Sequence, residues 1–269
     1  MSFFHLFAYG LIQGIAEFLP ISSSAHLALL PYFLKIEDPG VTFDLMMHIG
    51  TALAVIIYFR HDLILYLKEL KVAFSLKQNI NAKASFTRHL MIATCATFTI
   101  ALLLKSAGED WGRKPIFIIC NLVFFGIYMW IGDRQSDGTE KVLEGKLELK
   151  KSLLIGISQG IAVFPGVSRS GATIGTGRFL GLGREEASRF SFLLSLPVIV
   201  AGAIVKLPEV LRGGHSFQPM DCLLGIAFSF LFGFATIYVF MKLIKKIGLG
   251  YFTLYRFLLG AVLAYYFYF

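Results

Sequence analysis

Six runs of predominantly apolar residues decide what this chain can fold into. A helix that crosses a bilayer needs about 20 mostly apolar residues, because its backbone must satisfy its own hydrogen bonds in lipid. Of the 269 residues, 56% are hydrophobic and only 16% are charged, whereas about 25% are charged in a typical soluble domain. The sequence therefore predicts an all-α integral membrane protein. The expected spans are 43–59, 90–104, 115–132, 190–205, 221–241 and 251–269, some of them short.

Two further apolar stretches, 3–34 and 152–182, are interrupted by polar residues. The first is broken by Glu17, Pro20 and a run of serines, and the second by Arg169 and its flanking serines. Irregular backbone at membrane depth is tolerated only where it is buried in protein or lines a water-filled cavity. We therefore predict that each stretch forms a re-entrant helix–loop–helix hairpin.

The two interrupted stretches are related in sequence. Residues 10–26 read GLIQGIAEFLPISSSAH and residues 156–172 read GISQGIAVFPGVSRSGA, with eight identities and no gap. We interpret the chain as one polytopic membrane domain, 1–269, made of two repeats, 1–145 and 146–269. Each repeat has one hairpin and three spans, and an odd number of spans inverts the second repeat relative to the first. Many transporters share this plan, and their sites lie near the midplane where broken helices meet.

The distribution of Lys and Arg predicts the orientation in the membrane. The connections 60–88, 133–151 and 242–250 are rich in Lys and Arg, and the connections between them are poorer. Cytoplasmic loops carry an excess of these residues, so we expect the three basic connections in the cytoplasm. This assignment places the first hairpin on the outer side, the second on the inner side and the C-terminus outside. It also accounts for the net charge of +8 without nucleic acid.

Glu17 and Arg169 are the two charged residues within the interrupted stretches that most suggest function. A carboxylate in an apolar segment costs a few kcal/mol and is a functional candidate by default. The second repeat has Val163 where the first has Glu17, so the repeat architecture alone does not require the carboxylate. Arg169 stands where the first repeat has Ser23. Its guanidinium needs an anionic partner, either Glu17 in a structural ion pair or a ligand phosphate, which it can bind through two parallel hydrogen bonds.

Hydroxyl groups surround these charges in both repeats. Serine after a proline break is a common helix N-cap, and capping alone explains many such hydroxyls. A capped helix N-terminus also presents N–H groups and a partial positive charge to anions. We expect two such termini to face each other with Arg169 between them. The candidate phosphate-binding residues are Ser22, Ser24, Ser168, Arg169, Ser170, Gly171 and Thr173.

His26 follows the serines by two residues. A lone histidine near an apolar face is more often a core residue, but here it is close enough to Ser23 to act as a base, an acid or a nucleophile. Asp44 and His48 lie one turn apart near the start of a span and could support such a site. The sequence does not choose among Ser23, His26 and a metal-bound water as the nucleophile. The candidate catalytic residues are Glu17, Ser23, His26 and Arg169.

The two motifs resemble the signatures of the undecaprenyl-diphosphate phosphatase family, also called the bacitracin-resistance protein family. QGIAEFLPISSSAH (13–26) and PGVSRSGAT (165–173) carry the likeness, and the segments 43–60, 189–202 and 255–260 extend it over nearly the whole chain. The resemblance implies a hydrolase that converts undecaprenyl diphosphate to undecaprenyl phosphate. Such an enzyme recycles the lipid carrier of peptidoglycan synthesis and confers bacitracin resistance. It implies a place in the bacterial inner membrane, with the active site open to the periplasmic or outer face.

The resemblance also implies a divalent cation and roles for individual residues. The functional positions of the family correspond to Glu17, Ser23, His26, Ser168, Arg169 and Thr173. Family members use Mg²⁺ or Ca²⁺, and Glu17 is the implied metal ligand here. The family often has a second Glu where this chain has Gln13, and Ala25 replaces the Gly that commonly precedes the His. This chain therefore offers one carboxylate where the family often has two.

A translocase for undecaprenyl phosphate or a related anionic lipid is the alternative function. Inverted repeats with broken helices also suit alternating access to a lipid. In either case the expected partners are the lipid substrate and the membrane, and no nucleic acid. A homodimer is among the assemblies that the sequence allows.

Overall fold

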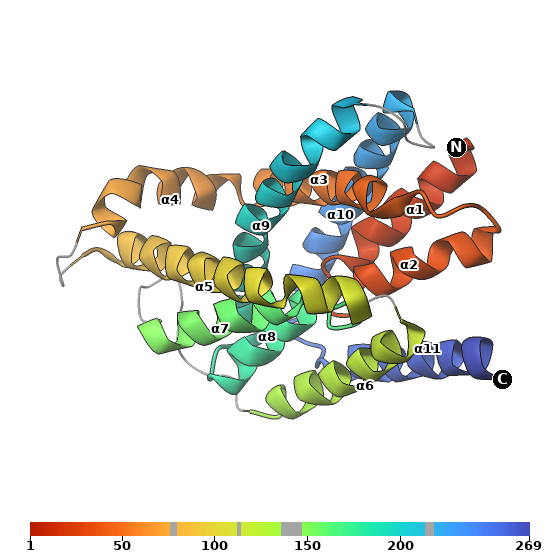
Figure 1. Cartoon of the computed structure of the whole chain (residues 1–269). Coiled ribbons are helices and arrows are strands. Elements are labelled where there is room, and N and C mark those ends of the chain that lie inside the picture. The colour runs from red at the N-terminus through yellow and green to blue at the C-terminus, as the bar shows by residue number, and fades with distance from the viewer. Residues whose placement is uncertain (76–79, 112–113, 136–146, 213–217) are drawn as a thin grey trace.

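All regular elements in the described part of the chain are helices, which confirms the predicted all-α class (Figure 1). The computed structural model describes residues 1–75, 80–111, 114–135, 147–212 and 218–269. The helices are α1 (Phe3–Ala16), α2 (Ser23–Leu34), α3 (Gly40–Tyr58), α4 (Arg60–Ala73), α5 (Ala82–Trp111), α6 (Pro115–Gly132), α7 (Leu149–Ile161), α8 (Arg169–Phe179), α9 (Arg184–Arg212), α10 (Pro219–Leu243) and α11 (Gly250–Tyr268).

Several helices have the length and composition of membrane spans. A further candidate is the pair α3 and α4, which is bent by 84°. The last predicted span is the helix α11, but its tyrosines and Arg256 lower its mean hydropathy and it does not meet the same criterion. Within the described residues, four single helices do meet it: Ala82–Gly108, Pro115–Gly132, Arg184–Val205 and Met220–Leu243. The chain is therefore a multi-pass membrane protein.

The connection after α3 contains a helix that the sequence analysis did not predict. α4 packs against α5, and the ring of Tyr66 stacks on that of Phe86 with 4.5 Å between centroids. Arg60, Lys68 and Lys71 lie on its exposed face. The basic residues that indicated a loop therefore belong to a surface helix that is held to the bundle by its aromatic face.

Both interrupted stretches fold as two helices joined by a short break, as predicted. The first break (17–22) joins α1 to α2, and the second (162–168) joins α7 to α8. The residue before the second helix has a positive φ in both repeats, +76° at Ser22 and +67° at Ser168. This conformation costs a residue other than glycine about 1–3 kcal/mol. The two breaks thus share one strained geometry at equivalent positions of the repeat.

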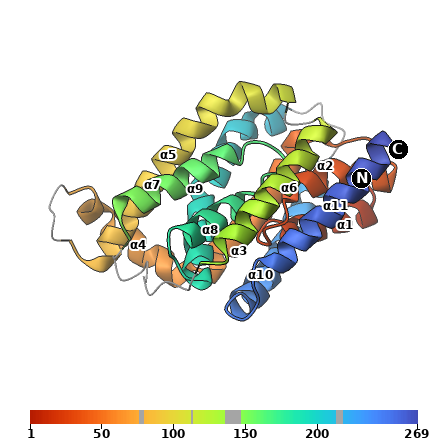
Figure 2. The same cartoon turned by 90° about the horizontal axis from the view of Figure 1, so that it is seen from below.

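The first helix of each hairpin packs closely against a long helix of the other half. α1 packs against α10, and α7 packs against α5, beside which it lies in Figures 1 and 2. A Cβ added to Gly10 would lie 2.3 Å from the Cβ of Phe228, and one added to the equivalent Gly156 would lie 2.2 Å from the carbonyl oxygen of Ala93. Glycine is therefore required at both contacts. The inversion of the halves in the membrane stays a prediction, and the repeat boundary at 145/146 lies outside the described residues.

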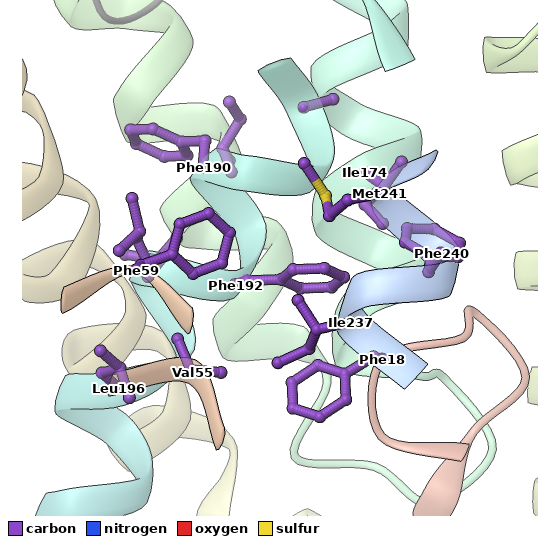
Figure 3. Packing of buried hydrophobic residues seen from close by; sticks show 14 of the residues in the cluster. Phe18, Val55, Phe59, Ile174, Phe190, Phe192, Leu196, Ile237, Phe240 and Met241 are labelled. Atoms are coloured by element: carbon purple, nitrogen blue, oxygen red, sulfur yellow. The ribbon is translucent and has the colours of Figure 1, made fainter. Parts of the chain in front are cut away.

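The main hydrophobic core contains side chains from both hairpins, among them Phe18 and Ile174 (Figure 3). Phe18, in the first break, packs edge-on against Phe192 of α9 with 5.2 Å between ring centroids. Ile174 of α8 and Ile237 of α10 belong to the same cluster. Because the cluster draws side chains from both hairpins, apolar packing positions one break relative to the other.

Replacing Gly156 with Ala tests the close contact between α7 and α5. The new methyl group would collide with backbone atoms of Ala93, and overpacking of this kind costs about 1–3 kcal/mol. We expect a lower thermal unfolding midpoint in detergent. Gly108→Ala is the matched control, because its methyl group would meet Val163 at an ordinary 3.5 Å. Equal midpoints for Gly156→Ala and the unaltered protein would contradict the contact.

Candidate active site

The carboxylate of Glu17 is the centre of a polar cluster between the two breaks. Glu17 directly follows α1 and is buried, with 8% of its surface exposed. Its Oε2 accepts hydrogen bonds from Gln13 Nε2 at 3.1 Å and from Ser23 Oγ at 2.7 Å, and it lies 3.3 Å from His48 Nε2. Its Oε1 accepts a hydrogen bond from Arg169 Nη2. One carboxylate thus brings together groups from α1, α2, α3 and α8.

Arg169 brings the second repeat into this cluster. It is the first residue of α8, and its side chain is 18% exposed. The pairing with Glu17 that the sequence suggested is therefore present. A guanidinium has five N–H donors in a planar fork, so the same side chain can keep the carboxylate and bind a phosphate.

His48 of α3 is a direct partner of Glu17 that the sequence analysis underestimated. Its Nδ1 lies 2.8 Å from the carbonyl oxygen of Asp44, and its Nε2 faces the carboxylate. Both partners are acceptors, which suits the imidazolium form because both of its ring nitrogens donate. The one-turn spacing of Asp44 and His48 was the signal in the sequence. It does not reveal which hairpin the histidine meets.

The serines before α2 and α8 occupy equivalent positions but make different contacts. Ser168 caps α8 as predicted, because its Oγ accepts a hydrogen bond from the backbone N–H of Gly171 at 3.1 Å. It also lies 3.3 Å from Ser170 Oγ. Ser22 makes no capping hydrogen bond with its side chain, and its Oγ lies 3.2 Å from Ser24 Oγ. The paired hydroxyls are therefore a shared feature of the repeat, and the cap belongs to the second repeat.

Gly171 and Thr173 are accounted for by helix packing. A Cβ on Gly171 would lie 2.9 Å from Met129 Sδ, so the glycine allows α6 to pack closely against α8. The hydroxyl of Thr173 donates to the carbonyl oxygen of Arg169 at 2.8 Å and lies 2.6 Å from Ser191 Oγ of α9. A role of these two residues in phosphate binding stays a prediction.

The two breaks are also joined directly and through α11. Ser170 Oγ donates to the carbonyl oxygen of Leu19 at 3.2 Å. Arg256 of α11 is fully buried, and its guanidinium donates to the carbonyl oxygens of Pro20 at 3.4 Å and Gly166 at 2.6 Å. The sequence analysis missed Arg256, although a lone arginine in an apolar run is itself a signal.

His26 lies beside this cluster and is not in contact with its charges. Its Nδ1 lies 2.8 Å from the carbonyl oxygen of Ser22, and its Nε2 lies 2.6 Å from the hydroxyl of Tyr255. No hydrogen bond joins it to Glu17 in the part of the chain that the structure describes. It follows Ser23 by three residues on α2, so the two side chains share one face of that helix.

Comparison with known proteins decides the family. Residues 6–262 match the family described as Bacitracin resistance protein BacA. The chain belongs to the BacA family. It is 37% identical to a protein named undecaprenyl-diphosphatase from Gemmatimonas aurantiaca, over 97% of each chain. It is 38% identical to one of the same name from Alteromonas mediterranea, over 98% of each, and 36% identical to undecaprenyl-diphosphatase 1 of Pseudoalteromonas translucida, over 97% of each.

The residues around Glu17 do not fit the resident divalent cation that the BacA family resemblance implied. Such cations take several oxygen ligands, but both carboxylate oxygens already accept from donors, and Arg169 adds a positive charge. Gln13 Oε1 is buried without a partner. The equivalent Gln159 Oε1 is also buried without a hydrogen-bond partner. The amide nitrogen of Gln159 donates to the hydroxyl of Thr97, and among the described residues it meets no carboxylate. The described residues hold no group of three or more His, Cys, Asp or Glu placed for a metal.

Replacing Gln13 with Glu is expected to create a cation site, which the residues around Glu17 do not form. The new carboxylate would stand one helical turn from Glu17 and make the local charge more negative by one unit. With Mn²⁺ as the probe and no substrate, electron paramagnetic resonance should show binding at least about tenfold tighter than in the unaltered protein. Adding Glu17→Gln restores a single carboxylate and should abolish the gain. Tight Mn²⁺ binding by the unaltered protein would contradict our interpretation of the site.

Proposed function

We propose that this protein hydrolyses undecaprenyl diphosphate to undecaprenyl phosphate and inorganic phosphate. The observation that carries the proposal is the contact of Glu17 with Arg169, made where two hairpin breaks meet inside apolar sequence. The names of the full-length relatives support the same substrate. We place the protein in the bacterial inner membrane with its site toward the outer face. There it recycles the carrier lipid of peptidoglycan synthesis and confers bacitracin resistance.

The terminal phosphate binds between Arg169 and the starts of α2 and α8. Phosphoryl transfer requires neutralisation of the charge on the equatorial oxygens and a nucleophile in line with the leaving group. Arg169 supplies a fixed positive charge. The first N–H groups of each helix have no partner within the helix and carry the positive end of its dipole. Together these groups place a positive charge and N–H donors around the phosphate.

The hydrogen bond from Ser23 to Glu17 favours Ser23 as the nucleophile. At 2.7 Å, it directs the hydroxyl proton at the carboxylate that would accept it. Ser23 Oγ attacks the terminal phosphorus, the bond to the bridging oxygen breaks, undecaprenyl phosphate leaves and Glu17 holds the proton. A water then attacks the phosphoserine and gives one proton to His26 Nε2. Glu17 returns its proton to Ser23, and His26 releases its proton to solvent.

A divalent cation, where one is needed, would be held by the oxygens of the diphosphate and not by the protein. The residues around Glu17 offer it no site of their own, and two linked phosphates supply several oxygen ligands at once. The translocase alternative stays a separate hypothesis, because no contact among the described residues favours it over hydrolysis.

Replacing Arg169 with Ala should lower phosphate release from a C55 diphosphate in detergent by about 100-fold or more, as loss of one preorganised charge-stabilising group does. Arg169→Lys keeps a cation beside Glu17 but loses the planar fork, so it should fold and remain strongly impaired. Glu17→Gln should be inactive for lack of the proton acceptor. The control is Arg184→Lys, at an ion pair with Asp133, which should keep near-normal turnover. A folded Arg169→Ala protein with near-normal turnover would exclude the assignment.

A further inference from the structure

The hydroxyl of Tyr255 holds the side chain of His26 from a distant part of the chain. The Tyr255 oxygen lies 2.6 Å from His26 Nε2, and the two rings stack at 10° with 5.7 Å between centroids. Among the described residues this is the one hydrogen bond between α2 and α11. Tyr255 immediately precedes Arg256, whose guanidinium binds carbonyl oxygens of both breaks. The tyrosine is therefore next to the residue of α11 that binds both breaks.

The partners of His26 determine which nitrogen carries its proton. The carbonyl oxygen of Ser22, 2.8 Å from Nδ1, can only accept, so Nδ1 must donate. In a neutral imidazole the other nitrogen then has a lone pair. The Tyr255 hydroxyl can donate to that lone pair, and the ring is held on both sides. The lone pair of Nε2 is thus available to accept a proton. It accepts a hydrogen bond from the Tyr255 hydroxyl until another donor replaces that hydroxyl.

We propose that Tyr255 is a positioning residue for His26. Its hydroxyl keeps the imidazole in the neutral form protonated at Nδ1 and holds the ring on the face of α2 that carries Ser23. The proposal rests on the function proposed above, in which His26 accepts the proton of the water that attacks the phosphoserine. Partners that orient a functional histidine in this way are worth about 10–100-fold in activity.

Replacing Tyr255 with Phe removes the hydroxyl and keeps the stacked ring. We expect kcat for phosphate release to fall about 10–100-fold with KM nearly unchanged, because the substrate-binding groups are untouched. Nitrogen NMR of histidine-labelled protein should show the single Nδ1–H form of His26 in the unaltered protein and a mixture of forms in Tyr255→Phe. Tyr251→Phe, at an exposed position of the same helix, is the matched control and should retain full activity.

A double-mutant cycle with His26→Gln tests whether Tyr255 acts through His26. Tyr255→Phe should have little further effect in the His26→Gln background. An equal fall in kcat in both backgrounds would overturn the proposal, and so would a Tyr255→Phe protein with full activity. Neither result would affect the proposed hydrolysis, which the Arg169→Ala and Glu17→Gln variants test separately.

Discussion

The negative charge of Glu17, buried where lipid would otherwise surround the chain, is the constraint on which the rest of the site depends. An isolated carboxylate in such a place is strongly unfavourable, and it persists only with charged partners and hydrogen-bond donors. Glu17 has both, from Arg169, His48, Gln13 and Ser23. These donors come from four helices. Satisfying one charge therefore requires that both hairpins and α3 meet at one point.

The two repeats share their scaffold and differ in their chemistry. The strained residues Ser22 and Ser168 are equivalent, and so are the close-packed glycines Gly10 and Gly156. The functional groups are not equivalent. The residue of the second repeat that corresponds to Glu17 is Val163, which is 37% exposed. Duplication thus provides two similar breaks with helix N-termini. The substitutions within them place a carboxylate, Glu17, in one break and a guanidinium, Arg169, at the end of the other.

α11 supports the site although it supplies no residue to the polar cluster around Glu17. Arg256 binds backbone carbonyl oxygens of both breaks, and Tyr255 binds His26. An arginine held by carbonyl oxygens neutralises no local carboxylate, so it adds positive potential beside the place where a phosphate would bind. Backbone positioning and charge complementarity are therefore supplied by one side chain. This dependence links the last helix of the chain to the first break.

The sequence by itself determined the helical membrane fold, the two hairpins, and Glu17 and Arg169 as the charged residues within them. Those features depend on local properties, namely the length of apolar runs, their polar interruptions and the internal repeat. The structure decided the partners of these residues: His48 beside Glu17, Arg256 across the two breaks and Tyr255 on His26. It also placed Gly171 against α6, joined Thr173 to Ser191 by a hydrogen bond, and placed a helix where a loop was expected. These contacts join residues far apart in the chain through helix packing, and a single His, Arg or Tyr in an apolar run has no spacing that reveals which helix it will meet.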